Sequence, residues 1–485
     1  MKKIILSILI IPLVSMSLMA QNDLDAMRFS QNFYGGTGRS LAMGGAFGAL
    51  GGDFSSLSIN PAGIGVYRGS EFTITPSINF NKATASYLST DYSDVKYKFG
   101  LNNLGFVSTY NTNRNEGWVS ASFAIGYNRL NDFNQNISIV GHDAHSSLLD
   151  EFAANSNGLT STPASPYYED LAYNTYLLNI PDTTIKPYVY TNVLQGIYGQ
   201  DQEEQITTRG GIGEYTFSFG ANYSNKLYLG LTVGIQSLRY DEVKHHTETE
   251  VTPIPEFHSF TLDEYFNTTG TGYNLKLGAI YKPVEMVRLG LAFHLPTFYK
   301  LESEFHTNMD AYFDPDPNFD DHLNARSDNQ INDYNLVTPA HLIGSVALQF
   351  GSMGLLSFDY DYVNYPSAKL RSDNDSYTDI NDMIQNNYRS ASNFRIGGEL
   401  RFDNLYLRGG YAYYGTPNTE KTGNAKASFS QASAGFGLRT RTFFFDVGVA
   451  DRFQDEKYYL YHTPPAIADI KTSNITGVAT FGFRF

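Results

Sequence analysis

The sequence predicts an all-β protein, a transmembrane antiparallel β-barrel of about 14 strands with an N-terminal plug inside its lumen. Three observations predict this fold. Apolar and polar residues alternate in many successive segments, and the connections between these segments are alternately tight and long. After the N-terminal apolar run, no further apolar run is long enough to span a membrane as a helix. A soluble β-sandwich would share the alternation, with its apolar faces forming a core instead of meeting lipid.

The alternation is clearest in residues 227–236, where Leu229, Leu231 and Val233 would share one face of a strand. The opposite face carries glycines and small polar residues, which suits a lumen. The patterns predict strands that begin near Glu71, Leu101, Trp118, Glu214, Lys226, Phe260, Met286, Asn335, Met353, Asn393, Asn404, Ser428, Arg441 and Thr472.

The predicted connections separate by length. Tight turns are expected near residues 223–226, 282–285, 351–352, 402–404 and 439–441. Long loops are expected at 141–209, 310–334 and 365–392. Outer-membrane barrels have short periplasmic turns and long extracellular loops, so the pattern places both termini in the periplasm of a Gram-negative bacterium. A sandwich has no reason to separate its loops in this way.

The chain divides into three predicted parts. Residues 1–20 have the basic start, apolar run and small final residue (Ala20) of a secretory signal peptide, with an uncleaved membrane anchor as the alternative. Residues 21–68 form the predicted plug, and residues 69–485 the barrel. The segment 30–65 is rich in both glycine and apolar residues, so it needs a container that packs its side chains and pairs its backbone.

This glycine-rich segment resembles the plug of the FadL-type outer-membrane transporters, which take up long-chain fatty acids and other hydrophobic compounds. Asn60, Pro61 and Ala62 match the family's hatch signature. The upstream positions that carry the resemblance are Ser30, Gly36, Gly38, Arg39, Gly44, Gly45, Ala46 and Asp53. Residues 336–340, 394–402 and 409–413 resemble later strands of the same family.

The resemblance implies diffusion of hydrophobic molecules through a plugged barrel with a lateral exit, and an apolar lumen pocket beside the plug. Ligand and gating residues would be Asn60, Pro61 and Ala62, with Phe33 and Phe54 of the same plug. Gly126 and Asn128 are candidates for a kink in the third strand, because a glycine inside a strand often marks a bend. Leu148, Leu149 and Phe152, spaced as on one helix face, are candidates for an extracellular ligand-capture platform, with a lid that packs on itself as the alternative.

Charged residues on the predicted lumen face form a further candidate group. The alternation places Arg395, Glu399, Arg401 and Arg408 inside the barrel. Buried charges need partners, so these side chains either pair across the lumen or hold the plug.

The sequence argues against several other functions. A formal charge of -15 argues against nucleic acid, and the absence of cysteine excludes thiolate chemistry. No catalytic triad or phosphate loop is present, so we expect neither an enzyme nor a cofactor. We also expect no metal site: His142 and His145 lack a third ligand, and the acidic segment 314–321 lacks EF-hand spacing, although it could hold calcium.

The predicted partners are hydrophobic small molecules, outer-membrane lipid and, through the terminal Phe485, the barrel assembly machinery, and the barrel is expected to be monomeric. The alternative function is a FadL-like shuttle barrel of the type IX secretion system that binds secreted proteins.

Overall fold

The chain forms a closed antiparallel barrel of 14 strands in a computed structural model that describes residues 23–160, 165–254, 257–315, 317, 320–373 and 375–485. The predicted signal peptide lies outside these residues. In chain order the wall consists of β1 (Glu71–Tyr87), β2 (Thr90–Asn111), β3 (Trp118–Asp132) with β4 (Gln135–Gly141), β7 (Asp201–Tyr223), β8 (Leu227–Ile254), β9 (Phe257–Val284), β10 (Val287–His294) with β11 (Phe298–Tyr312), β13 (Gln330–Val337) with β14 (His341–Phe350), β15 (Gly354–Asn364), β17 (Ser390–Phe402), β18 (Leu405–Tyr414), β19 (Phe429–Arg439), β20 (Phe443–His462) and β21 (Pro465–Arg484).

The barrel closes because β1 pairs with both its neighbour β2 and the last strand, β21. The predicted alternation is confirmed. On β8 the outward Leu229, Leu231 and Val233 are 38–43% exposed, whereas the inward Tyr228 and Thr232 are buried. Higher on the same outward face the residues become polar, which marks the upper limit of an apolar belt suited to lipid.

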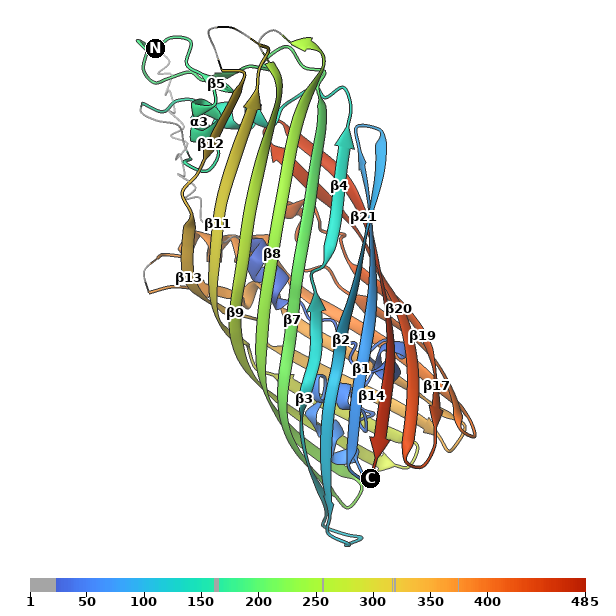
Figure 1. Cartoon of the computed structure of the whole chain (residues 1–485). Helices are drawn as coiled ribbons and strands as arrows, with labels where there is room; N and C mark the ends of the chain where they lie inside the picture. Colours follow the sequence, from blue (N-terminus) through green and yellow to red (C-terminus); the bar gives the residue numbers. More distant parts are fainter. Residues whose placement is uncertain (1–22, 161–164, 255–256, 316, 318–319, 374) are drawn as a thin grey trace, which may run out of the picture.

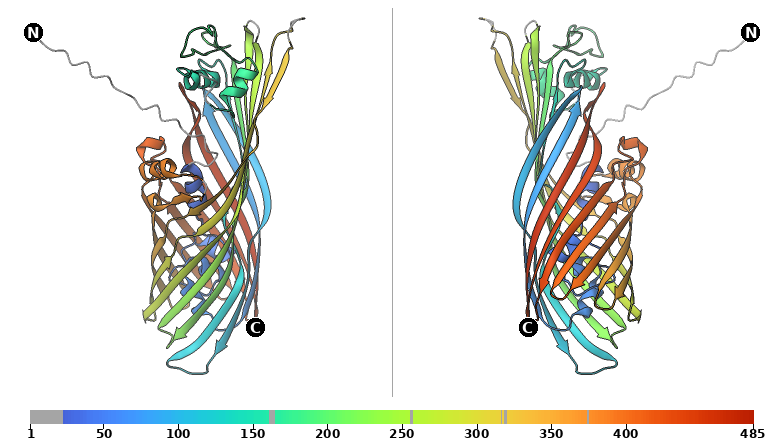
Figure 2. Two further views of the ribbon diagram at one scale, coloured as in Figure 1. Left: turned by 90° about the vertical axis from the view of Figure 1, so that its left-hand side faces the viewer. Right: turned by 90° about the vertical axis from the view of Figure 1, so that its right-hand side faces the viewer.

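The barrel wall is much taller on one side than on the other (Figures 1 and 2). Strands β7, β8 and β9 rise well above the short strands β15 to β19, and the chain ends at the opposite, short-turn rim. The predicted loops 141–209 and 310–334 are longer than the loops in the structure. Residues from Asp201 already belong to β7, and β11, β12 (His322–Arg326) and β13 occupy much of the second segment.

The N-terminal segment lies inside the barrel (Figure 1). It comprises α1 (Asp23–Ser30), α2 (Gly38–Ala42) and the 3-10 helices η1 (Phe54–Ser58) and η2 (Pro61–Val66), and most of its residues are buried. We call residues 23–66 the plug. The described chain begins inside the barrel, where the Asn387 side chain donates a 2.8 Å hydrogen bond to Asp23.

The tall wall is covered by a cap made of residues 142–200, of which residues 161–164 are not described. Its elements are α3 (Leu148–Ser156), α4 (Glu169–Asn174), β5 (Leu178–Asn179) and β6 (Thr191–Asn192). Leu148, Leu149 and Phe152 are at most 7% exposed and pack with residues of the wall such as Phe260. In this arrangement they form a core and offer no open apolar surface, so ligand capture by them stays a prediction.

The lower rim of the mouth is covered by residues 365–392, of which residue 374 is not described. They form η3 (Tyr365–Ser367), β16 (Lys369–Arg371) and α5 (Thr378–Asn387), and η4 (Glu420–Thr422) follows between β18 and β19. Helix α5 packs against α1 through Ile384, which shares a buried cluster with Met27 and Phe29. Among the described helices, none has the length and apolar character needed to cross a membrane.

Candidate functional site

The plug contacts the wall at places where glycines of neighbouring strands lie side by side. Gly230 and Gly278 are paired in register, and the chain at Asn60 and Pro61 passes directly over them. A Cβ atom on Gly278 would lie 2.0 Å from the Asn60 Oδ1, and one on Gly230 would lie 2.2 Å from the Pro61 carbonyl oxygen. The absence of side chains therefore lets the plug backbone approach the wall.

Asn60 fixes the local conformation of the plug and joins it to the wall. Its Oδ1 accepts a hydrogen bond from the Ala62 N–H at 3.1 Å and so caps η2, which begins at Pro61. Its Nδ2 donates to the Gly48 carbonyl at 2.6 Å and to the Ala279 carbonyl of β9 at 3.2 Å. Ala62 is fully buried beside Tyr228 and Ile280.

The two predicted kink residues lie next to the plug. Gly126 pairs with Gly105 of β2, and the Phe54 ring fills the space above both glycines. Asn128 faces the lumen and donates to the Ser58 hydroxyl at 2.9 Å. The β3 backbone keeps its pairing through both residues, and the strand breaks only at 133–134, after a register shift between Arg129 and Asn131. The break thus lies several residues beyond the predicted positions.

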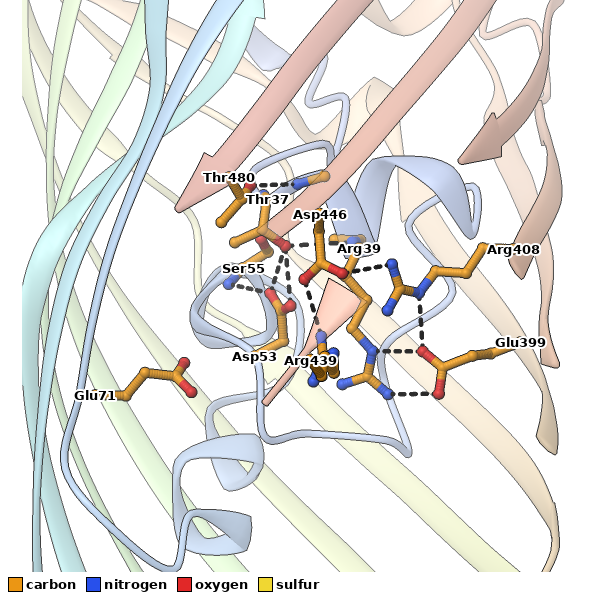
Figure 3. Close-up of polar contacts among 12 residues, drawn as sticks. Thr37, Arg39, Asp53, Ser55, Glu71, Glu399, Arg408, Arg439, Asp446 and Thr480 are labelled. Carbon is orange, nitrogen blue, oxygen red and sulfur yellow. Dashed lines mark hydrogen bonds and ion pairs between the residues drawn. The ribbon is translucent and has the colours of Figure 1, made fainter. Parts of the chain in front are cut away.

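A buried network of charges anchors the plug (Figure 3). Arg39 of α2 reaches Glu399 of β17, with 2.9 Å between Nε and Oε2. Glu399 also accepts from Arg408 of β18, and Arg408 in turn pairs with Asp446 of β20 at 2.6 Å. Burial lowers the pKa of the Arg39 guanidinium, but the nearby Glu399 and Asp53 carboxylates outweigh it and raise the pKa above its usual value. The plug is therefore tied to three strands by one charged network.

The other predicted lumen charges also lie near the plug. Arg401 pairs with the second oxygen of Glu399 at 2.9 Å and is partly exposed. Arg395 is fully buried between Asp359 and Asp361, and the Asp359 carboxylate accepts from the Gly48 N–H of the plug at 3.0 Å. Carboxylates and arginines of the wall thus hold the plug on both sides.

The wall itself contains a gap between β2 and β4. The β2–β3 ladder runs from the Asn111–Ser120 pair to the Asn103–Asn128 pair and ends there. Beyond it, the rest of β2 pairs with β1, and β4 pairs with β7. Adjacent strands of a barrel normally share a continuous ladder, so this part of the wall lacks backbone closure.

Side chains bridge the gap. Lys96 of β2 donates to the Asn136 Oδ1 at 3.0 Å and to the Thr208 carbonyl at 2.9 Å. Ser138 of β4 donates to Asp94 at 3.0 Å. Tyr97 and Phe99 flank the gap on the outside and are 65% and 80% exposed.

A cavity lies between the plug and the wall, next to the gap. Phe33, Tyr34 and Leu41 line it on the plug side, and Arg129 and Asp132 at the edge of the gap. The remaining wall residues of the cavity are Asn79, Asn102, Leu130, Asn131, Gln431, Arg452, Asn474 and Thr476. The expectation of an apolar pocket is therefore wrong for this cavity, because its wall side is mostly polar.

Sequence reasoning missed Lys96, Arg129, Gln431 and Arg452 as residues of the site. Each faces inward in a strand, and only the register between strands shows which of them meet the plug. In the described parts of the chain, no group of three His, Asp or Glu residues is arranged to hold a metal ion.

Comparison with known proteins supports the fold. No protein-family model matches the chain, and no curated protein matches it. Among solved structures, the Pseudomonas putida toluene transporter TodX superposes with a TM-score of 0.55 at 13% identity, covering 94% of this chain and 99% of that one. A Pseudomonas aeruginosa FadL homologue gives a TM-score of 0.53 at 14% identity, with 92% and 98% covered.

The Ralstonia pickettii toluene transporter TbuX is similar to the same degree, with a TM-score of 0.52 at 15% identity and 94% and 99% of the two chains covered. All three likenesses extend over more than nine-tenths of this chain. The chain therefore has the fold of the FadL-type outer-membrane transporters.

Proposed function

We propose that this barrel carries hydrophobic compounds, long-chain fatty acids among them, across the outer membrane of a Gram-negative bacterium, and that it is not an enzyme. The observation that carries the proposal is the end of the β2–β3 ladder at Asn103 and Asn128, directly beside a cavity that touches the plug. A ligand in that cavity has a short lateral route through the wall.

The outside of the gap suits a hydrophobic ligand. The rings of Phe80 and Tyr97 pack at a tilt with their centroids 4.9 Å apart, and Phe99 beside them is largely exposed. Aromatic residues are favoured where a membrane protein meets the lipid interface. A molecule leaving the gap would therefore enter the membrane along an apolar surface.

A lateral route also avoids moving the plug. Breaking a buried ion pair by removing one partner costs about 3–5 kcal/mol. The plug is held by such pairs at Arg39 and by a hydrogen bond to Asp359. The gap is bridged by hydrogen bonds from Lys96 and Ser138 and by one ion pair, Lys98 with Asp132, whose lysine is partly exposed. Opening the gap is the smaller rearrangement.

The apolar face of α3 is buried, so the first capture of ligand at the surface of the protein needs other residues. Apolar residues that the cap does expose are Tyr173, Tyr176, Ile185, Val189 and Ile197. We propose that ligand first contacts these exposed residues. Its transfer past Leu148, Leu149 and Phe152 then requires the cap to loosen.

The short-turn rim would face the periplasm. Phe485 ends the chain there, 72% exposed, with its backbone paired to Ser70. Such a residue is available to the barrel assembly machinery, and the closed barrel needs no second copy to pair its strand edges, which is why we propose a monomer.

The shuttle function of a type IX secretion barrel is favoured by one observation. The cap covers the tall wall and also carries exposed apolar residues, as a surface for protein partners would. Co-purification of secreted cargo with the intact barrel, in the absence of oleate uptake, would support this alternative.

The transport proposal is tested by uptake of labelled oleate into proteoliposomes. The wild type is compared with Asn60→Ala and with a barrel lacking residues 21–65. Saturable uptake by the wild type supports transport, and a reduction in Asn60→Ala shows that transport depends on the plug conformation that Asn60 holds. If the intact protein takes up no oleate and the truncated barrel leaks oleate and small hydrophilic solutes alike, the barrel is a plugged pore with another function.

A further inference from the structure

Three polar side chains form a row on the inner face of the wall, opposite the plug. Gln431 of β19 is in register with Arg452 of β20, and Arg452 is in register with Asn474 of β21. All three line the cavity beside the plug. Directly opposed residues have Cβ atoms about 4.5–5.5 Å apart, so the three side chains can reach one small chemical group.

Donors in this row lack acceptors. The Gln431 side chain is only 6% exposed, and its Nε2 has no hydrogen-bond partner among the residues that the structure describes. Within the described ranges, the Arg452 guanidinium has no ion pair or hydrogen bond, and Asn474 only accepts, from Thr476 at 3.3 Å. Buried polar groups nearly always have partners, so the Gln431 amide calls for an acceptor from outside the chain, and the half-buried Arg452 and Asn474 beside it can share that acceptor.

The plug orients the central arginine. The Phe33 ring lies 3.7 Å from the Arg452 guanidinium carbon, and Phe33 also packs edge-on against Tyr414 and Phe429. Stacking covers the face of the guanidinium and leaves the N–H groups at its edge for a ligand. A planar guanidinium matches the two oxygens of a carboxylate.

The charge in the cavity favours an anion. Its charged side chains are Arg129, Asp132 and Arg452. Asp132 already accepts from Arg129 at 2.9 Å and from the Asn134 side chain at 2.6 Å, and it pairs with Lys98 outside the cavity at 3.4 Å. Its carboxylate is therefore already neutralised, and the positive charge of Arg452 remains. One negative charge would balance the site.

We propose that Gln431, Arg452 and Asn474 bind the carboxylate of a small organic acid, whose apolar part lies against Phe33 and Leu41. The site adds charge recognition to a barrel proposed to carry hydrophobic compounds. The anion site depends on the proposed transport function only for its role in the cell, because the binding of an anion can be measured without transport.

The test is calorimetric titration of the full-length mature barrel in an uncharged detergent with benzoate, with the neutral analogue benzamide and with inorganic phosphate. Two variants probe the row. Gln431→Glu keeps the side-chain shape but places an internal carboxylate beside Arg452, and Arg452→Gln removes the charge. Arg441→Gln, at an exposed turn, is the matched control.

We expect wild type and Arg441→Gln to bind benzoate about tenfold or more tightly than benzamide and phosphate, and both row variants to lose about tenfold or more in benzoate affinity. Gln431→Glu should also melt at a higher temperature than the wild type, because its carboxylate pairs with Arg452. That increase would show that the variant folds. The proposal is overturned if the wild type fails to bind benzoate, if benzamide or phosphate binds equally well, or if Gln431→Glu keeps its benzoate affinity.

Oleate uptake by the same preparations separates this inference from the transport function. Benzoate binding without oleate uptake leaves the anion site standing and removes transport. Oleate uptake without benzoate binding leaves the transport function standing and removes the anion site.

Discussion

Asn103 and Asn128 face each other on the last rung of the β2–β3 ladder, where the Asn103 Nδ2 donates to the Asn128 Oδ1 at 2.8 Å. Directly beyond this pair the two strands separate, and contacts such as that between Ser138 and Asp94 replace the backbone ladder. The pair marks the boundary between the closed wall and the gap through which we propose that ligand passes.

A disulfide across the gap should therefore block transport. The hydrogen-bonded atoms of Asp94 and Ser138 lie 3.0 Å apart, and the chain has no cysteine of its own, so Asp94→Cys with Ser138→Cys introduces a unique pair. We expect oleate uptake into proteoliposomes to fall about tenfold or more on oxidation and to return on reduction, because a covalent link holds the gap closed.

The matched control for this disulfide is Thr84→Cys with Ser93→Cys. Their hydroxyl oxygens lie 2.8 Å apart within the continuous β1–β2 ladder, so a link there should leave uptake unchanged. Unaltered uptake by the oxidised gap variant would place the route elsewhere.

Neutralising Glu399 should loosen the plug. The Glu399→Gln variant leaves Arg39 and Arg408, both nearly fully buried, without their shared carboxylate. Loss of one partner from a buried ion pair costs about 3–5 kcal/mol, so the free energy of unfolding in urea should fall by roughly that amount. Small hydrophilic solutes should also leak into proteoliposomes as the plug moves.

Arg401→Gln provides the comparison. Arg401 pairs with the same carboxylate, but its side chain is 23% exposed, so the expected loss is about 0–1 kcal/mol. Equal losses for the two variants would show that Glu399 does not anchor the plug through Arg39.

The strands were predictable from the sequence because alternation is a local property. The breaks of two strands were also marked locally, since Pro296 lies between β10 and β11 and Pro339 between β13 and β14. The break after β3 has no such marker: residues 133–134 are Phe and Asn, and the strands separate because of pairing with distant segments. Single-residue patterns do not determine that register.

The same distinction between local patterns and the pairing of distant strands explains which site residues the sequence could predict. The Asn60-Pro61-Ala62 segment was identified by its resemblance to known plugs, and the capping of η2 follows from its own residues. In contrast, Gln431, Arg452 and Asn474 are separated in sequence and meet only across three strands. The helical spacing of Leu148, Leu149 and Phe152 predicted an apolar face, but it could not show that the wall covers that face.

A methyl group at one glycine beneath the plug should disturb it. The Cβ of a Gly278→Ala variant would meet the Asn60 Oδ1 at 2.0 Å and the Ala62 nitrogen at 2.8 Å. Overpacking of this kind costs about 1–3 kcal/mol in unfolding free energy. We also expect faster hydrogen exchange at the Ala62 amide, because its hydrogen bond to Asn60 is displaced.

Gly344→Ala is the control for this substitution. Gly344 also lies in a strand, and a Cβ there meets nothing within 4 Å, so stability and exchange should stay as in the wild type. If Gly278→Ala behaves like Gly344→Ala, the close approach of Asn60 to the wall does not constrain the plug.

The cap should lose stability as pH rises, because of Glu169. Burial raises the pKa of this carboxyl above 4.5, although Asn155 donates to one of its oxygens at 2.9 Å. A raised pKa means that the folded cap binds more protons than the unfolded one. Stability is therefore fully present below the unfolded pKa and is lost as pH rises from about 4.5 through the folded pKa.

Hydrogen exchange in α3 and α4, corrected for intrinsic rates, measures this dependence. We expect protection in the wild type to fall between acidic and neutral pH, whereas Glu169→Gln, which stays neutral, should keep its protection throughout that range. Asp170→Asn, at the adjacent, partly exposed position, should retain the wild-type dependence. Protection of the wild-type cap that increases over the same interval would contradict the role of Glu169, because a buried carboxyl with a raised pKa can only destabilise the fold as it ionises.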